Sequence, residues 1–240
     1  MTQLRWRRNI ALRSHPVVPF KEPHPRHCRQ ISCDQAMNDL PAAIITATIC
    51  AYWFGVGMMI VRVKRHSRDI PILSPKQPLE RFMGAIFVPV VALWIILPWL
   101  AQTGTRLPLA IPAFASQMPV YGACRWLAAI VAVLCLIATA RCWARMGKDW
   151  RMAVAVDEKT NLITDGPFRR IRHPIYAFQI LLMICTVVVV PTLPMLAVAV
   201  AHIALMNVKA RNEERHLLQT QPDDYSRYVQ RTGRFFPRIS

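Results

Sequence analysis

The pattern of apolar residues divides the chain into long hydrophobic runs separated by shorter polar segments. Three runs, at residues 40–61, 82–101 and 120–140, are close to the roughly 20 residues that a helix needs to cross a bilayer. Two shorter runs follow at residues 175–190 and 195–206. Long apolar runs of this kind, without the alternation typical of strands, predict membrane-spanning helices.

The last two runs are separated by a short segment that contains Pro191 and Pro194. Proline disrupts a helix interior, and a single helix over both runs would be longer than the bilayer is thick. We therefore predict a tight helical hairpin whose turn lies at or just below the far membrane surface. The predicted fold class is all-α and integral to the membrane, with about five transmembrane helices and a cytoplasmic C-terminal helical cofactor site.

Composition supports a membrane protein and changes how the charge is interpreted. Hydrophobic residues make up 54% of the chain, while the formal net charge of +17 on its own would suggest a nucleic-acid partner. The basic residues, however, lie in the segments between the apolar runs, as cytoplasmic loops do. We expect no nucleic-acid partner. Most cysteines lie within apolar runs and no zinc-like spacing occurs, so we expect neither a disulfide framework nor a metal site.

The distribution of basic residues predicts how the chain is oriented. Residues 62–81 contain six Lys or Arg, residues 141–172 contain eight and residues 207–240 contain seven, whereas residues 101–118 contain only Arg106. Five spans place the three basic segments on one side of the membrane, which the positive-inside rule assigns to the cytoplasm. We therefore expect a cytoplasmic C-terminus and, from the bacterial style of the motifs described below, a bacterial inner membrane.

The first 36 residues conflict with this topology, because five spans place them outside while they contain seven Lys or Arg. They also lack the continuous apolar core of a signal peptide. We predict that translation begins at Met37 and that residues 1–36 are a non-native or disordered basic leader. The alternative is a genuine disordered basic arm. Residues 37–140 would then form three transmembrane helices, and residues 141–240 the functional core with its loop, hairpin and C-terminal helices.

A candidate binding motif, Arg172-His173-Pro174-Ile175-Tyr176, lies where a charged loop meets the fourth apolar run. Proline is favoured in the first turn of a helix, where the free N–H groups and the helix dipole attract anions. Arg172 or His173 can add charge-assisted hydrogen bonds to such an anion. The alternative is that His-Pro only caps a helix while Arg172 anchors in the lipid headgroups.

Two adjacent carboxylates, Glu213 and Glu214, follow the fifth run on its expected helical extension. Adjacent helical residues point about 100° apart, so we expect one carboxylate to face the site and the other to face solvent or basic neighbours. The site-facing carboxylate suits a cationic group, and together with the anion-binding helix start it suits a zwitterion. The alternative is a surface ion pair between Lys209 and Glu213, four residues apart.

These motifs recur together in a known family. The stretch from Leu162 to Tyr176, then Arg211 to Glu214, Asp224-Tyr225 and Arg234 to Pro237 closely resembles the isoprenylcysteine carboxyl methyltransferase / phospholipid N-methyltransferase family over about residues 141–238. The resemblance implies transfer of a methyl group from S-adenosylmethionine to a lipid-like or lipidated acceptor at the cytoplasmic membrane face. No Gly-x-Gly-x-x-Gly loop is present, which argues against a Rossmann-type methyltransferase.

The resemblance also implies roles for individual residues. It implies that Lys209 contacts the methyl acceptor, with Arg211 as a competing candidate for this role. It also implies catalytic roles for Arg172, Lys209 and Glu213. Two departures matter: Phe178 stands where the prenylcysteine enzymes typically have a small residue, and Phe168 replaces a common tyrosine. The identity of the acceptor therefore stays open. The positions implied to bind the cofactor are Thr160, Asn161, Leu162, Ile163, Phe168, His173, Pro174, Ile175, Tyr176 and Glu213.

Two other functions remain as alternatives. Membrane sterol or enone reductases that use NADPH also carry an Arg-His-Pro-x-Tyr segment, but usually with Asn before the Tyr and without the double glutamate. A nicotinamide phosphate would also need more basic residues at its site. The second alternative is a non-catalytic membrane protein that keeps the fold, for which Phe178 is the best argument.

Overall fold

The computed structural model describes residues 39–66, 78–147, 150 and 162–238. The predicted leader at residues 1–36, Thr160 and Asn161 lie outside these residues. Within the described part the regular structure is helical, apart from two isolated β-bridges. The helices are α2 (Leu40–His66), α3 (Pro78–Gln102), α4 (Ala113–Ser116), α5 (Pro119–Met146), the 3₁₀ helix η2 (Gly166–Arg169), α6 (Pro174–Val189), α7 (Leu193–Thr220) and α8 (Pro222–Arg231).

The predicted all-α membrane fold and the C-terminal hairpin are confirmed. Helices α2, α3, α5 and α7 are long and apolar enough to cross a membrane. Helix α6, with 16 residues, is only about 24 Å long, shorter than a typical hydrocarbon core. The helical extension expected beyond the fifth apolar run, which ends near residue 206, is present, and α7 runs to Thr220. Its polar second half is helical as well, because it packs against α8 and the loop that precedes α6.

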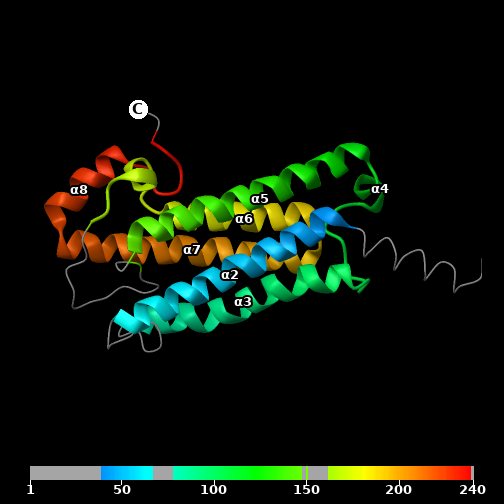
Figure 1. The fold of residues 1–240 in the computed structure, drawn as a ribbon, viewed down its shortest axis with the longest axis horizontal. Helices are drawn as coiled ribbons and strands as arrows, with labels where there is room; N and C mark the ends of the chain where they lie inside the picture. Colours follow the sequence, from blue (N-terminus) through cyan, green and yellow to red (C-terminus); the bar gives the residue numbers. More distant parts are fainter. Residues whose placement is uncertain (1–38, 67–77, 148–149, 151–161, 239–240) are drawn as a thin grey trace, which may run out of the picture.

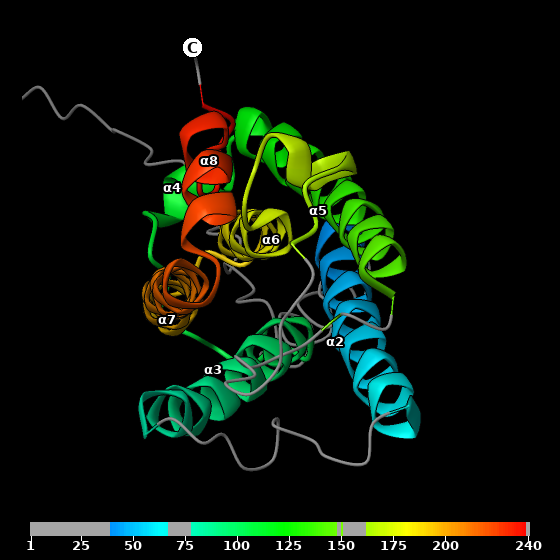
Figure 2. The same ribbon diagram turned by 90° about the vertical axis from the view of Figure 1, so that its left-hand side faces the viewer.

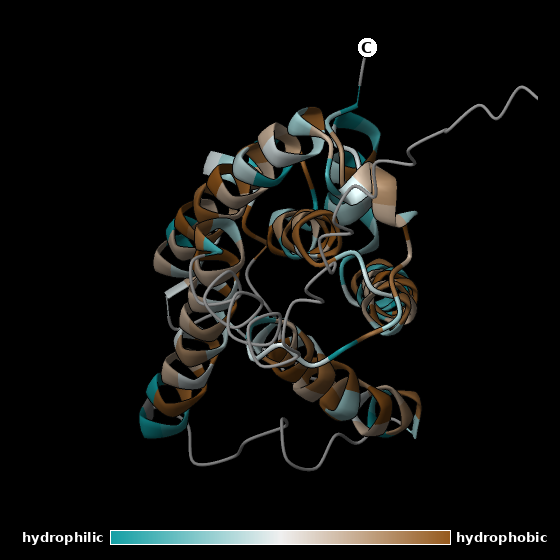
Figure 3. Cartoon of the chain, turned by 90° about the vertical axis from the view of Figure 1, so that its right-hand side faces the viewer, coloured by the Kyte–Doolittle hydropathy of each residue, from teal (hydrophilic) through white to brown (hydrophobic). Residues whose placement is uncertain are grey.

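Five helices form a bundle in which α6 packs against α2, α5 and α7, while α3 packs against α2 and α7 (Figure 2). Helices α2, α3, α5, α6 and α7 alternate in direction, so η2 and α8 gather at one end and α4 with the α6–α7 turn at the other (Figure 1). We call these the site end and the far end. Hydrophobic residues dominate the long helices, whereas hydrophilic residues are prominent around α8 (Figure 3).

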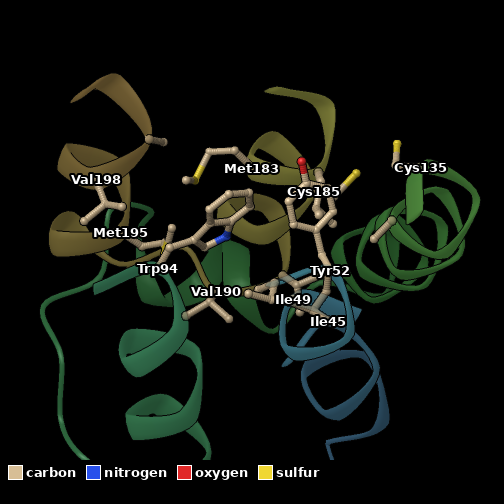
Figure 4. Close-up of a cluster of buried hydrophobic side chains, with 14 of the residues drawn as sticks. Ile45, Ile49, Tyr52, Trp94, Cys135, Met183, Cys185, Val190, Met195 and Val198 are labelled. Carbon is tan, nitrogen blue, oxygen red and sulfur yellow. The ribbon is translucent and has the colours of Figure 1, made fainter. Parts of the chain in front are cut away.

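The core lies between the long helices and centres on Trp94 of α3, which is fully buried (Figure 4). Its indole Nε1 donates a hydrogen bond of 3.1 Å to Thr186 Oγ1 of α6. Ile45 and Ile49 of α2 and Met183 of α6 belong to the same cluster. The one polar atom of a large aromatic side chain is thus satisfied inside an apolar core.

The far end is held together by polar contacts between chain segments. Arg125, the charge within the third predicted span, forms an ion pair with Asp39 and donates a 3.2 Å hydrogen bond to the carbonyl of Val189. Tyr121 donates to the carbonyl of Val188 at 2.8 Å. Since Val188 and Val189 lie in the last turn of α6, these contacts satisfy carbonyls that a helix end leaves without partners.

Candidate active site

The loop before α6 is fastened to the rest of the site end on both sides. Asp165 accepts a 2.9 Å hydrogen bond from Arg145 Nε at the end of α5. Gly166 follows with a φ of +56°, a conformation that favours glycine, and opens η2. Further along, the backbone N–H of Arg172 donates to the Gly233 carbonyl at 2.8 Å. The segments before α6 and after α8 therefore form one hydrogen-bonded unit.

Helix α6 begins at Pro174, with His173 as its N-cap residue, as the motif predicted. The N–H of His173 donates to the Arg234 carbonyl at 3.1 Å, so the cap is held in place by the segment after α8. His173 and Tyr176, three residues apart, have rings that are 5.5 Å apart and inclined by only 6°. Two aromatic rings are thereby presented side by side at the start of α6.

Glu213 of α7 faces these two rings. The Tyr176 hydroxyl donates a hydrogen bond to Glu213 Oε1, and His173 Nδ1 lies 3.4 Å from Glu213 Oε2. The Glu213 side chain is 23% exposed, so this carboxylate is held by protein groups while it keeps access to solvent. The motif before α6 and the glutamate after the apolar part of α7 therefore meet in one site.

Glu214 has different partners from its neighbour. Arg172 Nε donates to Glu214 Oε1 at 3.0 Å, and Arg234 donates to both Glu214 oxygens, with Nε 3.0 Å from Oε1. Arg172 also donates to the carbonyls of Val229 and Thr232. The sequence predicted that one glutamate would face basic neighbours or solvent, and Glu214 faces two arginines. Through these contacts Arg172 holds the loop before α6 against α7 and α8. A contact of Arg172 with a reactant stays a prediction.

The imidazole of His173 lies between the two carboxylates. Its Nε2 is 3.3 Å from Glu214 Oε1 but is not aligned for a hydrogen bond, so it is a buried polar atom without a full partner. Burial lowers the pKa of His173, but the nearby carboxylates of Glu213 and Glu214 outweigh burial and raise it above the ordinary value. The site therefore favours the cationic imidazolium and can hold or release a proton there.

A third carboxylate, Glu80 at the start of α3, was not among the predicted site residues. It is only 5% exposed, accepts a 2.7 Å hydrogen bond from Asn212 Nδ2 and lies 3.5 Å from Lys209 Nζ. Lys209, for which the sequence suggested an ion pair with Glu213, forms an ion pair with Glu80. A carboxylate at the start of an apolar run was the signal available in the sequence, since such groups are costly near a membrane.

Helix α8 begins at Pro222 and packs against the site from the side of the loop. Tyr225 and Tyr228 are buried. The Tyr228 hydroxyl donates a 2.6 Å hydrogen bond to the carbonyl of Phe168. Burial raises the pKa of Tyr228 to about 12, so the hydroxyl keeps the proton that it donates. Tyr228 thereby links α8 to η2, and Phe168 itself is buried.

The remaining predicted residues are the two candidate acceptor-binding residues and the apolar residues near the start of α6. Lys209 is largely buried and faces Glu80, whereas Arg211 is exposed, so the geometry favours Lys209 over Arg211 as the acceptor-side residue. Leu162, Ile163 and Ile175 are half-buried and Pro174 is buried, while Phe178 packs against the core. Among the residues that the structure describes, no three His, Cys, Asp or Glu side chains are grouped as metal ligands would be.

A comparison with protein families finds a match in the region that carries this site. Residues 127–219 match the model of the Isoprenylcysteine carboxyl methyltransferase (ICMT) family. This segment is therefore similar to the isoprenylcysteine carboxyl methyltransferase family. It contains His173, Tyr176 and Glu213, whereas Glu80 and Arg234 lie outside it. The methyltransferase-family segment is therefore completed by side chains from the helix before it and the segment after it.

Two curated relatives show similarity over part of the chain. The nickel-cobalt-cadmium resistance protein NccN of Alcaligenes xylosoxydans xylosoxydans is 29% identical over 98 residues, which are 40% of this chain and 46% of the relative. The cobalt-zinc-cadmium resistance protein CzcN of Cupriavidus metallidurans is 33% identical over 99 residues, which are 40% of this chain and 45% of the relative. The matches thus span just under half the length of these relatives.

Proposed function

We propose that this protein transfers a methyl group from S-adenosylmethionine to a lipid-like or lipidated acceptor, at the cytoplasmic face of a bacterial inner membrane. The observation that carries the proposal is the meeting of His173, Tyr176 and Glu213 in one site within the family-matched segment. The acceptor would be a membrane lipid or a lipidated small molecule or peptide. A carboxyl group is favoured as the methylated group, because a carboxylate needs no general base.

The charges at the site suit this cofactor. S-adenosylmethionine contains a sulfonium, an ammonium and a carboxylate, so it needs both anionic and cationic partners, and the site holds the Glu213 carboxylate beside His173, whose charged form it favours. Glu213 is placed to bind the ammonium, and the ring of Tyr176 to face a cationic centre. His173 Nε2, buried without a full hydrogen-bond partner, is the polar atom that a ligand would satisfy. The predicted positions Leu162 and Ile163 would line the apolar part of the cofactor.

When bound, S-adenosylmethionine supplies an electrophilic methyl group. The protein's residues act mainly by position: an in-line displacement requires that both reactants are held close together and that water is excluded. Lys209, held by Glu80, is placed to orient an acidic acceptor group. Arg172, through Glu214, keeps the loop and the start of α6 in register, so we propose a positioning role for it.

The ion pairs of the basic residues at the site favour a methyltransferase over the NADPH-dependent reductase. Arg172 and Arg234 are bound to Glu214, and Lys209 is paired with Glu80. A nicotinamide phosphate would need basic groups that are not already shared with carboxylates. The names of the two curated relatives refer to metal resistance and state no reaction, so they add no acceptor to the proposal.

The proposal can be tested with the full chain purified in neutral detergent. S-adenosylhomocysteine and NADPH are titrated separately by calorimetry, and S-adenosylmethionine with a tritiated methyl group is incubated with the protein and membrane vesicles of the expression host. We expect micromolar binding of the homocysteine cofactor, no heat from NADPH, and label in the lipid or lipidated fraction. Binding of NADPH instead would favour the reductase, and no binding of either would favour a non-catalytic protein.

A further inference from the structure

A second candidate binding site lies beside the methyltransferase site and does not depend on it. Arg170, Arg231 and Arg238, together with Pro237, line one pocket at the site end of the bundle. The three arginines come from different segments: the residue after η2, the last residue of α8 and the C-terminal tail. Three guanidinium groups from separate segments therefore meet around one space.

The backbone that carries these arginines is held by hydrogen bonds. The N–H of Gly233 donates to the Arg170 carbonyl at 3.1 Å, which fastens the end of η2 to the residues after α8. Arg238 Nη1 donates to the Gln230 carbonyl at 2.8 Å, which returns the tail to α8. A Cβ atom at Gly233 would lie 1.7 Å from the Phe236 carbonyl oxygen, so the tail passes this glycine too closely for any side chain. The pocket is thus built on a fixed turn.

The charges in the pocket are unbalanced. Within the described ranges, none of the three arginines has an ion-pair partner, whereas neighbouring arginines do: Arg172 and Arg234 bind Glu214. Like charges brought together repel one another unless an anion lies between them. Guanidinium groups match the geometry of phosphate oxygens and bind them through paired hydrogen bonds. An anion of the phosphate type would therefore balance these charges.

The position of the pocket suggests where such a phosphate comes from. The pocket lies at the end of the bundle where α5 stops and α6 begins, next to Phe236, whose side chain is 80% exposed. A large exposed apolar side chain can insert at a membrane surface, and clusters of basic residues next to membrane spans attract anionic lipid headgroups. Phe236 would then insert beside the headgroup that the arginines bind.

We propose that Arg170, Arg231 and Arg238 form a phosphate-binding site, occupied by the headgroup of an anionic phospholipid. Because Arg172 and Arg234 share the same backbone unit, occupancy of this pocket stabilises the segments that hold the methyltransferase site. The same chemistry could be supplied by a soluble phosphate, and the experiment below separates these two sources.

The test measures the melting temperature of the full chain in neutral detergent, with increasing dioleoylphosphatidylglycerol, dioleoylphosphatidylcholine or inorganic phosphate. Arg170→Gln and Arg231→Gln are compared with Arg169→Gln, a variant of an exposed neighbouring arginine that does not line the pocket. We expect phosphatidylglycerol to raise the melting temperature of the wild type and of Arg169→Gln. Each pocket variant should need about tenfold more lipid, as loss of one charge-assisted hydrogen bond implies.

A rise that inorganic phosphate reproduces alone would support the phosphate site with a soluble ligand as its occupant. The proposal is overturned if neither phosphatidylglycerol nor phosphate stabilises the wild type. It is overturned equally if Arg169→Gln weakens the response as much as the pocket variants do, because the effect would then reflect total positive charge. Neither outcome depends on methyl transfer, so this test and the test of the proposed function can succeed or fail independently.

Discussion

The two ends of the bundle both contain partly buried ion pairs, but they use them differently. At the far end, Arg125 joins Asp39 to a carbonyl at the end of α6, and each group serves to connect helices. At the site end, one imidazole lies within 3.4 Å of two carboxylates, and His173 Nε2 lacks a full hydrogen-bond partner. In the structural contacts of the far end, the charged groups are paired with other protein groups. A binding site, by contrast, keeps polar atoms available for a ligand.

The same difference appears within the site end between two adjacent residues. Glu214 is bound by Arg172 and Arg234 and resembles the ion pair at the far end. Glu213 is bound by Tyr176 and keeps 23% of its side chain exposed. We infer that Glu214 mainly stabilises the loop and the C-terminal segment, while Glu213 faces the ligand. Substitutions at the two ends should therefore separate stability from binding.

The largest effect on stability is expected from Glu214→Ala. This change leaves Arg172 and Arg234 without their carboxylate in a largely buried setting, and breaking such a pair costs about 3 kcal/mol or more. Thermal unfolding in detergent should show a clearly lowered melting temperature. Glu214→Gln, which keeps the shape and an acceptor oxygen, should lose less. Equal melting temperatures for wild type and Glu214→Ala would contradict the holding role.

At the far end, Arg125→Gln should cost about 2 kcal/mol, because Asp39 and the end of α6 lose a charged partner that is about a quarter exposed. The melting temperature should fall, but binding of S-adenosylhomocysteine measured below the melting transition should not change. A loss of binding in this variant would show that the two ends are coupled.

The contact of Glu80 with Lys209 can be tested by a double-mutant cycle. Glu80→Gln and Lys209→Gln should each destabilise the protein, and the double variant should be less destabilised than the sum, with a coupling of about 1 kcal/mol. The charge-reversed double variant, Glu80→Lys with Lys209→Glu, should have a higher free energy of unfolding than either single variant. Strict additivity in chemical or thermal unfolding would rule out a direct interaction between them.

The smallest effect is a pH dependence that comes from His173. Its pKa is raised in the folded protein, so its charged form stabilises the fold fully below the ordinary histidine pKa of about 6.5. This contribution is lost as the pH rises through the raised folded value. Melting temperatures of the wild type should therefore fall on going from weakly acidic to alkaline pH more than those of His173→Gln. Parallel pH profiles would contradict the charge assigned to this imidazole.

Hydrophobic runs were enough to predict the helices and the hairpin, because burial in a membrane requires long apolar segments. The helical extension that carries Glu213 and Glu214 was expected, but the runs could not predict its end at Thr220, since residues 207–220 are polar and their helix is stabilised by packing against other segments. The motif predicted the start of α6 at Pro174, where the chemistry of one residue decides the structure. Local sequence was therefore informative wherever the cause was local.

The site itself could be predicted only in part. His173, Tyr176 and Glu213 were expected together from the family resemblance, and the structure places them together. Glu80 was missed because its partner Asn212 lies 132 positions away in sequence, and a local sequence pattern cannot predict such a contact. Arg234 was part of the motif but had no assigned role until its contact with Glu214 was visible. Long-range ion pairs require the fold to be known.

The central claim, that the site end binds the cofactor while the far end only connects helices, is tested most directly by one comparison. S-adenosylhomocysteine is titrated by calorimetry into wild type, Glu213→Gln and Arg125→Gln, each at a temperature well below its own melting transition. The account predicts that Glu213→Gln loses at least tenfold in affinity, as loss of one charged contact implies, while Arg125→Gln binds as the wild type does. Unchanged binding by Glu213→Gln would contradict the account.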